Sequence, residues 1–355
     1  MANALAHMSD SGRTESRGRR DFLRRAAPAV SALALAGLSA PVFSDRAAEG
    51  STEERAFVHF RRRAMGCVFE VVFPAAAPSP EAARSGPRGP SGSRGAQEAL
   101  DRVDALDRQL SIYREDSEVS ALNRRAGAGP VVVEAGLFAL LEECERYRGE
   151  TAGAFDVVSG GSGESRLHLD PAERTVSLAR GSAISFDAVG KGYAVDRAAA
   201  LLRARGVEAA IVNSGHSSMY AIGAPVPLDP ARVLPWAQPR GWRVRVERPE
   251  ITAEGVSGSL GTVWLRNRAL GTSALGGRRE ILDPRTGAAA GGARGVTVLA
   301  PTAAAADALS TAFMVLGAEG AADYCRAHAD IGVLMYDGEK TVAFGTAHQE
   351  AEITA

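Results

Sequence analysis

Residues 185–213 read S-F-D-A-V-G-K-G-Y-A-V-D-R-A-A-A-L-L-R-A-R-G-V-E-A-A-I-V-N, and the fold prediction begins from this stretch. A strand-like run at 183–186 is followed by a turn of small residues at 188–192. Apolar residues then recur at helical spacing until Gly206, a residue type that often follows the end of a helix. The pattern predicts a strand, a tight turn and a helix, with Lys191 at the helix N-terminus.

A helix N-terminus that carries a lysine is suited to binding an anion. The first N–H groups of a helix lack intrahelical partners, the flanking glycines let a ligand approach, and Lys191 adds a full positive charge. Phosphate is the obvious candidate. The alternative is an ordinary strand–turn–helix with a solvated lysine. The stretch is neither a Walker loop nor a G-x-G-x-x-G fingerprint, so the common nucleotide-binding folds are not indicated.

A second stretch, 306–317, reads A-D-A-L-S-T-A-F-M-V-L-G and is predicted to be a helix. Asp307 and Thr311 stand four residues apart, so they lie on one face of that helix, one turn from each other. A carboxylate and a hydroxyl in this arrangement offer two oxygens to Mg²⁺. The alternative is structural, with an acidic residue at the helix N-terminus and a threonine that hydrogen-bonds back to the helix.

Eight motifs occur in a specific order along the chain. Together they resemble the FAD:protein FMN transferase (ApbE) family over roughly 57–345, and the resemblance implies an α+β fold: a single ApbE-type, T-fold-like domain with antiparallel sheets and packed helices. The motifs are M-G-C at Met65, L-S-I-Y at Leu110, D-S-E-V-S-A-L-N at Asp116, G-A-F-D at Gly153, A-V-G-K-G-Y-A-V-D at Ala188, G-T-S at Gly271, D-P-R-T-G at Asp283 and A-D-A-L-S-T-A at Ala306.

The resemblance also implies a reaction and a set of site residues. Mg²⁺ would be held by the Ala188 carbonyl, Asp307 and Thr311 and would bridge the pyrophosphate of FAD, the substrate. A threonine or serine hydroxyl of an acceptor flavoprotein would attack the FMN phosphorus, and AMP would leave. The residues expected to contact FAD are Met65, Tyr113, Ala154, Phe155, Asp156, Ser185, Lys191 and Leu282; for 154–156 the contacts are expected through the backbone.

The chain departs from the family pattern at several positions. Glu280 stands where the family has a histidine, so Glu280 and Lys191 are the candidate catalytic residues. His216 replaces the second glycine of the turn that follows 209–213, and Ser185 replaces an aspartate. The alternative function is therefore a non-catalytic or weakly active FAD-binding paralogue, a flavin carrier or scaffold.

Composition excludes several classes of protein. The chain has 355 residues, 45% apolar content and a formal net charge of −1, which is typical of a globular protein and gives no indication of nucleic-acid binding. Cys67, Cys144 and Cys325 match no zinc spacing. They are interpreted as reduced structural cysteines, with one disulfide at most.

The N-terminal segment resembles an export signal. S-R-G-R-R-D-F-L-R-R precedes an apolar run at 26–38, which is the layout of a twin-arginine signal peptide, predicted at 1–44 with Arg19 and Arg20 as the pair. We therefore expect export to the periplasm or cell envelope, where the acceptor flavoprotein would also lie. The apolar run is short for a bilayer span, so no stable membrane anchor is predicted; a retained anchor and a basic amphipathic arm are the alternatives.

The remaining chain is divided by composition. A linker is predicted at 45–56 and the transferase-like domain at 57–348. Within that domain, residues 74–95 are rich in proline, serine and glycine and show no apolar periodicity, so they are predicted to be a disordered insertion.

Changing Arg19 and Arg20 together to lysine tests the export prediction. The double variant should accumulate as a cytoplasmic precursor, because a receptor reads the arginine pair and not its charge alone. Cell fractionation measures this, and normal export of the variant would contradict the twin-arginine assignment.

Overall fold

The computed structural model describes residues 57–74, 90–161, 166–215, 217–225, 240–248, 251–252, 255–256, 258–275, 281–291 and 293–353. All of them belong to one compact unit, Ser39–Ala355. The predicted signal peptide and linker, Glu280 and His216 lie outside the described residues. None of the helices in the described part of the chain is long and apolar enough to cross a membrane.

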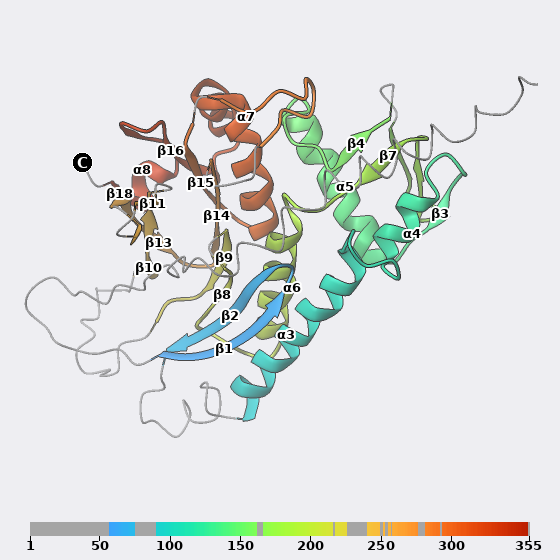
Figure 1. The fold of residues 1–355 in the computed structure, drawn as a ribbon. Helices are drawn as coiled ribbons and strands as arrows, with labels where there is room; N and C mark the ends of the chain where they lie inside the picture. The colour runs from blue at the N-terminus through green and yellow to red at the C-terminus, as the bar shows by residue number, and fades with distance from the viewer. Residues whose placement is uncertain are drawn as a thin grey trace, which may run out of the picture. The chain divides into compact units, whose positions relative to one another are not determined.

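An antiparallel sheet forms the centre of this unit (Figure 1). Its spatial order is β1-β2-β8-β9-β14-β15-β16-β17, and each neighbouring pair is antiparallel. The fold class predicted from the sequence, α+β with antiparallel sheets, is confirmed. The strands are β1 (Phe57–Ala64), β2 (Cys67–Pro74), β8 (Ala210–Ser214), β9 (Ser218–Ile222), β14 (Arg268–Ala274), β15 (Gly295–Ala300), β16 (Gly332–Tyr336) and β17 (Thr341–Gly345).

Both faces of this sheet are buried, and alternate residues serve different layers. Val71, Val212 and Tyr220 belong to the core on the helical face, whereas Val72 and Ile211 belong to a second core on the opposite face. The second core is closed by a small sheet with the order β10-β13-β18, which supplies Trp242 and Val263 among others. Its strands are β10 (Trp242–Glu247), β13 (Ser259–Leu265) and β18 (Ala351–Ile353).

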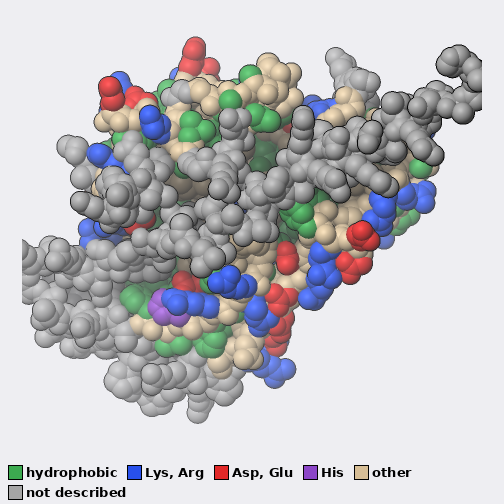
Figure 2. Space-filling model, in the orientation of Figure 1, with side chains coloured by type: hydrophobic (Ala, Val, Ile, Leu, Met, Phe, Trp, Pro, Cys, Tyr) green, Lys and Arg blue, Asp and Glu red, His purple; other side chains and the backbone are tan. Residues whose placement is uncertain are grey.

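Helices cover the other face (Figure 1). The helix that follows the A-V-G-K-G motif packs on β8 and β9, and the helix with the A-D-A-L-S-T-A motif packs on β14 and β15. A third helix packs along the first of these and carries charges of both signs on its exposed side (Figure 2). They are α6 (Gly190–Ala204), α7 (Ala303–Ala327) and α3 (Pro90–Leu110).

A smaller group of elements lies between α3 and α6 in the sequence. These elements are α4 (Glu118–Arg124), β3 (Val131–Val132), α5 (Ala135–Glu150), β4 (Val158–Gly160), β5 (Leu167–Asp170), β6 (Thr175–Leu178) and β7 (Ser182–Ile184); the remaining short elements of the chain are β11 (Ile251–Thr252), β12 (Gly255–Val256) and α8 (Ala347–Glu350).

Two boundaries differ from the sequence prediction. Most of the predicted insertion, 74–95, lies outside the described residues, but its last six residues already belong to α3, which begins at Pro90. Proline is compatible with the first helical turn, where its missing N–H is not needed. The helix predicted at 306–317 starts earlier and continues to Ala327, with a kink at Gly317, whose φ of 68° and ψ of −167° are not helical.

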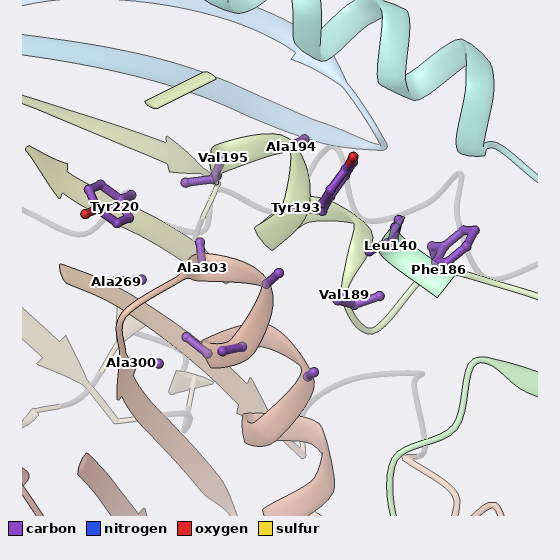
Figure 3. Packing of buried hydrophobic residues seen from close by; sticks show 14 of the residues in the cluster. Leu140, Phe186, Val189, Tyr193, Ala194, Val195, Tyr220, Ala269, Ala300 and Ala303 are labelled. Carbon is purple, nitrogen blue, oxygen red and sulfur yellow. The ribbon is translucent and has the colours of Figure 1, made fainter. Parts of the chain in front are cut away.

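The N-terminus of α7 is held against α6 by side chains from both helices. Asp196 of α6 accepts the Ala303 N–H at 2.8 Å and the Ala304 N–H at 2.9 Å. In return, Asp307 of α7 accepts the Gly192 N–H of α6 at 3.0 Å. Each carboxylate thereby satisfies amides that would otherwise be orphans at a helix start. Figure 3 shows Ala303 beside Val195 at this crossing.

The two helices approach so closely that glycine is required where they cross. A Cβ atom on Gly192 would lie 2.2 Å from the Ala303 carbonyl oxygen. On the sheet side of α7, a Cβ on Gly271 would lie 2.4 Å from the Ala306 carbonyl carbon. Backbone atoms cannot yield as a flexible side chain can, so α7 passes between α6 and β14 only because both positions lack side chains.

Gly192→Ala should therefore be strongly destabilising. We expect a loss of about 3 kcal/mol or more in the free energy of unfolding, because the new methyl group would overlap backbone. Gly149→Ala is the matched control: Gly149 lies in α5, a Cβ added there would meet nothing within 4 Å, and alanine should stabilise by up to about 1 kcal/mol. Chemical denaturation measures both, and equal effects would contradict the close crossing.

Asp196 should also make stability depend on pH. Burial raises the pKa of its carboxyl from 3.8 to about 6, although the Ala303 and Ala304 amides and Arg197 lower it. Because the folded pKa lies above the unfolded one, this stabilising contribution is complete below pH 3.8 and is lost as pH rises through about 6. Asn cannot titrate.

Relative to Asp196→Asn, the metal-free parent should thus lose about 1–2 kcal/mol of stability between pH 4 and pH 7, a figure reduced for partial exposure of the residue. Thermal unfolding of both proteins across this pH range measures the difference. If the stability difference between the two proteins does not change with pH, or if the parent gains stability relative to the variant as pH rises, the Asp196 pKa is not raised.

Candidate active site

The start of α6 and the first turns of α7 bring the main predicted site residues together. Asp307 is 4% exposed and faces the start of α6, where its Oδ2 accepts the Gly192 N–H. Burial raises the pKa of the Asp307 carboxyl, while the charge of Lys191, the Gly192 amide and the Ser218 hydroxyl lower it. Lys191 and Asp307, which are 116 positions apart in the chain, are therefore electrostatic neighbours.

The N-termini of the two helices differ in how many amides are free. The first four amides of α7 are all used: Asp196 accepts two, the Thr302 side chain accepts the third at 3.2 Å and the Thr302 carbonyl accepts the fourth at 3.1 Å. In α6 there is no side-chain cap, and no described residue accepts the Lys191 N–H. The start of α6 is accordingly the helix terminus with capacity to bind an anion.

Lys191 itself is half-buried, with its Nζ 3.4 Å from the Asp187 carbonyl oxygen, to which it donates. Its charge also reaches Cys67, where it opposes the effect of burial; burial dominates and raises the pKa of that thiol to about 11. Cys67 is consequently a neutral thiol near pH 7. All three cysteines are free in the structure, in keeping with their interpretation as reduced residues.

The Ala188 carbonyl lies at the turn before α6. In a regular helix its partner would be the N–H four residues later, which belongs to Gly192. That N–H donates to Asp307 instead. The same hydrogen bond that joins the two helices therefore leaves the Ala188 carbonyl without its usual helical donor.

Thr311 is one turn after Asp307, as predicted, and belongs to a cluster of hydroxyl groups. Its Oγ1 donates to the Asp307 carbonyl at 3.3 Å and lies 3.2 Å from Ser273 Oγ, which in turn lies 2.9 Å from Ser310 Oγ. The back-bonded threonine considered as an alternative is thus present in this structure. If Thr311 donates its one proton to the Asp307 carbonyl, Ser273 is the donor in the contact between the two hydroxyls, and one lone pair of Thr311 Oγ1 remains to bind a cation.

These groups fit a magnesium ion in their chemistry. A carboxylate, a hydroxyl and a carbonyl are hard oxygen donors, and a partly protein-bound Mg²⁺ completes its shell with water and phosphate oxygens. The buried Asp307 carboxylate carries a charge that its surroundings only partly compensate, and the buried Ser218 Oγ beside it has no hydrogen-bond partner among the described residues. Within the described part of the chain, no group of three or more His, Cys, Asp or Glu side chains is placed to hold a metal ion.

Met65 occupies the tight turn between β1 and β2. Both turn residues have positive φ, 49° for Met65 and 72° for Gly66, and the Met65 N–H donates to Asp107 Oδ1 at 3.1 Å. A methionine in this conformation is strained, since the two-residue turn favours Asn, Asp or Gly. The contact between Met65 and FAD stays a prediction.

The two other residues with large apolar side chains that are predicted to contact FAD at the surface are Tyr113 and Leu282. Tyr113 is 52% exposed in the segment after α3, and Leu282 is 49% exposed in a turn closed by its bridge to Ala289. Both stay predicted contact residues for FAD. The Leu282 turn lies against the G-A-F-D motif, because a Cβ on Gly153 would be 3.4 Å from Arg285 Cγ.

Within G-A-F-D, the side chains are committed to the protein itself. Ala154 and Phe155 are each 1% exposed, and Phe155 packs edge-to-face on Tyr147. The carboxylate of Asp156 is paired with Arg166 and accepts the Val158 N–H at 2.7 Å. Burial raises the pKa of the Asp156 carboxyl, against the effects of the Val158 amide and Arg166. Any contact of 154–156 with FAD would therefore use backbone atoms, as expected from the sequence.

Ser185 is half-buried, its N–H donates to the Val157 carbonyl at 2.9 Å, and its Oγ accepts the Asp187 N–H at 3.3 Å. It stays a predicted contact residue. Glu280 and His216 lie outside the described residues, so their predicted roles remain predictions.

Sequence reasoning missed three residues of this arrangement: Gly192, Asp196 and Ser218. The first two are inside the quoted A-V-G-K-G-Y-A-V-D motif, at i and i+4 on one helix face, which was a detectable signal of a shared partner. Ser218 gave no signal, because only the folded sheet brings it to α7.

Comparisons with known proteins identify the family of the chain. The model of the ApbE family matches residues 65–164 and 161–335. The chain belongs to the ApbE family. Among curated relatives, the FAD:protein FMN transferase of Treponema pallidum is 29% identical over 275 residues, covering 66% of this chain and 74% of that protein. The protein of the same name from Vibrio cholerae is 27% identical over 252 residues, covering 59% and 70%.

Solved structures of the ApbE family share the fold. The flavin transferase ApbE from Vibrio cholerae matches with a TM-score of 0.65 and 23% identity, covering 83% of this chain and 99% of that one. The ApbE protein of Thermotoga maritima matches with a TM-score of 0.64 and 20% identity, covering 84% and 100%. At these identities the structural likeness establishes the fold alone.

Asp307→Asn tests the metal-ligand prediction in this ApbE-family chain. Asparagine can still accept the Gly192 N–H. It also replaces a buried carboxyl group whose pKa is raised by burial. The metal-free stability of the variant at neutral pH should therefore equal or exceed that of the parent, within about 1 kcal/mol. Mg²⁺ should raise the melting temperature of the parent in the presence of FAD and leave the variant unaffected. Equal stabilisation of both proteins by Mg²⁺ would place the metal elsewhere.

Proposed function

We propose that this chain is a Mg²⁺-dependent transferase that moves FMN from FAD to a threonine or serine hydroxyl of an acceptor protein and releases AMP. The observation that carries the proposal is the junction of α6 and α7, where a buried carboxylate, a lysine and a helix amide with no acceptor among the described residues converge. The names of the curated relatives, all FAD:protein FMN transferases, support the same reaction.

In this proposal each group has a defined task. The Ala188 carbonyl, Asp307 and Thr311 hold the cation, which when bound supplies positive charge to the pyrophosphate. Lys191 adds a second positive charge, and its backbone N–H donates to a phosphate oxygen. Charge stabilisation of this kind is the main contribution that a protein makes to phosphoryl transfer.

The reaction breaks one bond and forms one bond at the FMN phosphorus. The oxygen of the acceptor hydroxyl forms a new P–O bond, and the P–O bond to the AMP phosphate breaks, so the electron pair leaves with AMP. The hydroxyl proton must pass to a base. Glu280 stands at the position of the family's histidine and is the candidate base.

Replacing histidine with glutamate has a predictable chemical effect. An ordinary carboxylate is ionised at neutral pH but is a weaker base than imidazole, and it adds negative charge beside a pyrophosphate. We therefore propose that transfer by this chain is slow while FAD binding is retained. This departure also favours the second candidate function, a weakly active or non-catalytic FAD-binding paralogue.

We infer the cellular location and the acceptor from the twin-arginine signal in the sequence. With twin-arginine export, the acceptor would be an envelope flavoprotein.

Incubating the mature protein with FAD, Mg²⁺ and an acceptor peptide of the family's D-x-x-[ST]-G-A-[ST] type tests the proposal, with AMP release and peptide mass as readouts. Glu280→Gln should abolish residual transfer, and Glu280→His should raise turnover, because imidazole is the better base. FAD affinity should change little in either variant.

Two outcomes would separate the candidates. FAD binding without AMP release in the parent and in Glu280→His would favour the carrier or scaffold. Rapid parental transfer that survives Glu280→Gln would show that the base lies elsewhere, with Asp187 and His216 as the next residues to test.

A further inference from the structure

Ser218 lies next to the proposed cation site but is assigned no role by the motifs. It is the first residue of β9 and pairs with Ser214 of β8 on one side and Gly271 of β14 on the other. Side chains alternate along a strand, so Ser218 faces the same way as Tyr220, into the core between the sheet and the helices.

That direction leads to the first turns of α7. Gly271, the neighbour of Ser218 in the sheet, is so close to α7 that a Cβ there would lie 2.7 Å from the Asp307 N atom. The Ser218 hydroxyl is consequently beside Asp307, and it is among the groups that lower the pKa of that carboxyl. Sheet register and electrostatics thus give the same neighbour.

The Ser218 hydroxyl has one neighbour that would explain its presence, the Asp307 carboxylate, whose pKa it lowers as a hydrogen-bond donor although the contact falls outside normal hydrogen-bond geometry. Ser218 is 2% exposed, and its Oγ forms no hydrogen bond of normal geometry with any residue in the described part of the chain. Its carbonyl, not its hydroxyl, accepts from Ser214 Oγ at 3.2 Å. A buried hydroxyl without a partner is costly, and alanine would avoid the cost, so stability alone does not account for serine here.

Asp307 has a matching vacancy in its hydrogen bonding. Its Oδ2 accepts the Gly192 N–H; the Ser218 hydroxyl is a further donor close enough to lower the pKa of the carboxyl, but it is not within normal hydrogen-bond geometry. A carboxylate that ligates a cation is usually held by hydrogen bonds from neighbouring groups, which fix its orientation.

We propose that Ser218 is a positioning residue of the cation site, which donates its hydroxyl proton to the Asp307 carboxylate when that carboxylate binds the cation. The inference rests on the proposed function, since it requires Asp307 to be a metal ligand. Ser218 does not touch the reacting atoms; it restricts the orientation of the carboxylate that does the binding. Loss of such a donor typically weakens metal affinity by about 10–100-fold.

Ser218→Ala tests the proposal, with Ser182→Ala as the matched control. Ser182 is a second buried serine, 4% exposed, whose Oγ likewise has no partner among the described residues, but it lies in β7. Mn²⁺ is the probe: its free concentration is followed by electron paramagnetic resonance in titrations of the full mature protein, with and without FAD. Thermal unfolding without metal is measured in parallel.

We expect Ser218→Ala to melt no lower than the parent without metal and to bind Mn²⁺ about 10–100-fold more weakly, because the variant loses a donor and no structural contact. Ser182→Ala should bind Mn²⁺ as the parent does. Ser218→Thr keeps the hydroxyl and should bind within about threefold of the parent, whereas a merely structural serine would show no such rescue.

The remaining outcomes overturn the proposal in distinguishable ways. If Asp307→Asn loses Mn²⁺ binding while Ser218→Ala binds within about threefold of the parent, the cation site stands and the role of Ser218 is refuted. If Ser218→Ala and Ser182→Ala weaken binding equally, the effect is general and the role is again refuted. If the parent binds no Mn²⁺ with FAD present, the cation site of the proposed function and the role of Ser218 both fail.

Discussion

The exchange of carboxylates between α6 and α7 is the constraint on which the site depends. Asp196 of α6 accepts the first two amides of α7, and Asp307 of α7 accepts an amide in the first turn of α6. The two interactions fix both helix starts at once, and they do so at a backbone separation that only glycine allows at position 192. One structural requirement therefore sets the position of Lys191, of the Ala188 carbonyl and of Asp307.

The same arrangement divides the electrostatic tasks between the two helices. The start of α7 is saturated by Asp196 and Thr302, so it has no free amide to offer a ligand. At the start of α6 the Lys191 amide has no acceptor among the described residues and the Lys191 ammonium donates to the Asp187 carbonyl, while Asp307 brings a negative charge that burial disfavours. A buried carboxylate beside a lysine is stable when further positive charge approaches it, and a cation carrying a phosphate meets that condition.

Much of this could be predicted from the sequence, because it is encoded locally. Apolar periodicity predicted the helices at the two motifs, the family resemblance implied the antiparallel sheets, and the four-residue spacing placed Asp307 and Thr311 on one face. What could not be predicted depends on tertiary packing. Nothing local to Gly192 indicates that a carbonyl lies where its Cβ would be, and the place of Ser218 beside Asp307 follows from strand register across β9 and β14.

The predicted helix boundaries were wrong for similar reasons. The glycine at position 317 is a normal signal for the end of a helix, yet α7 resumes after the kink because Ala321 and Tyr324 are buried in the core. The start of α3 at Pro90 was obscured by a composition rich in proline and glycine, although proline suits a first turn. Asp156 could be assigned to the G-A-F-D motif by resemblance, but its pairing with Arg166 is visible only in three dimensions.

The most direct test of the account is anomalous X-ray diffraction from crystals of the mature protein grown with FAD and Mn²⁺. The account predicts one strong manganese peak within about 2.5 Å of the Asp307 carboxylate, the Ala188 carbonyl oxygen and Thr311 Oγ1, adjoining the FAD pyrophosphate at the start of α6. A manganese peak remote from the α6–α7 crossing, or FAD bound with its pyrophosphate away from Lys191, would contradict it.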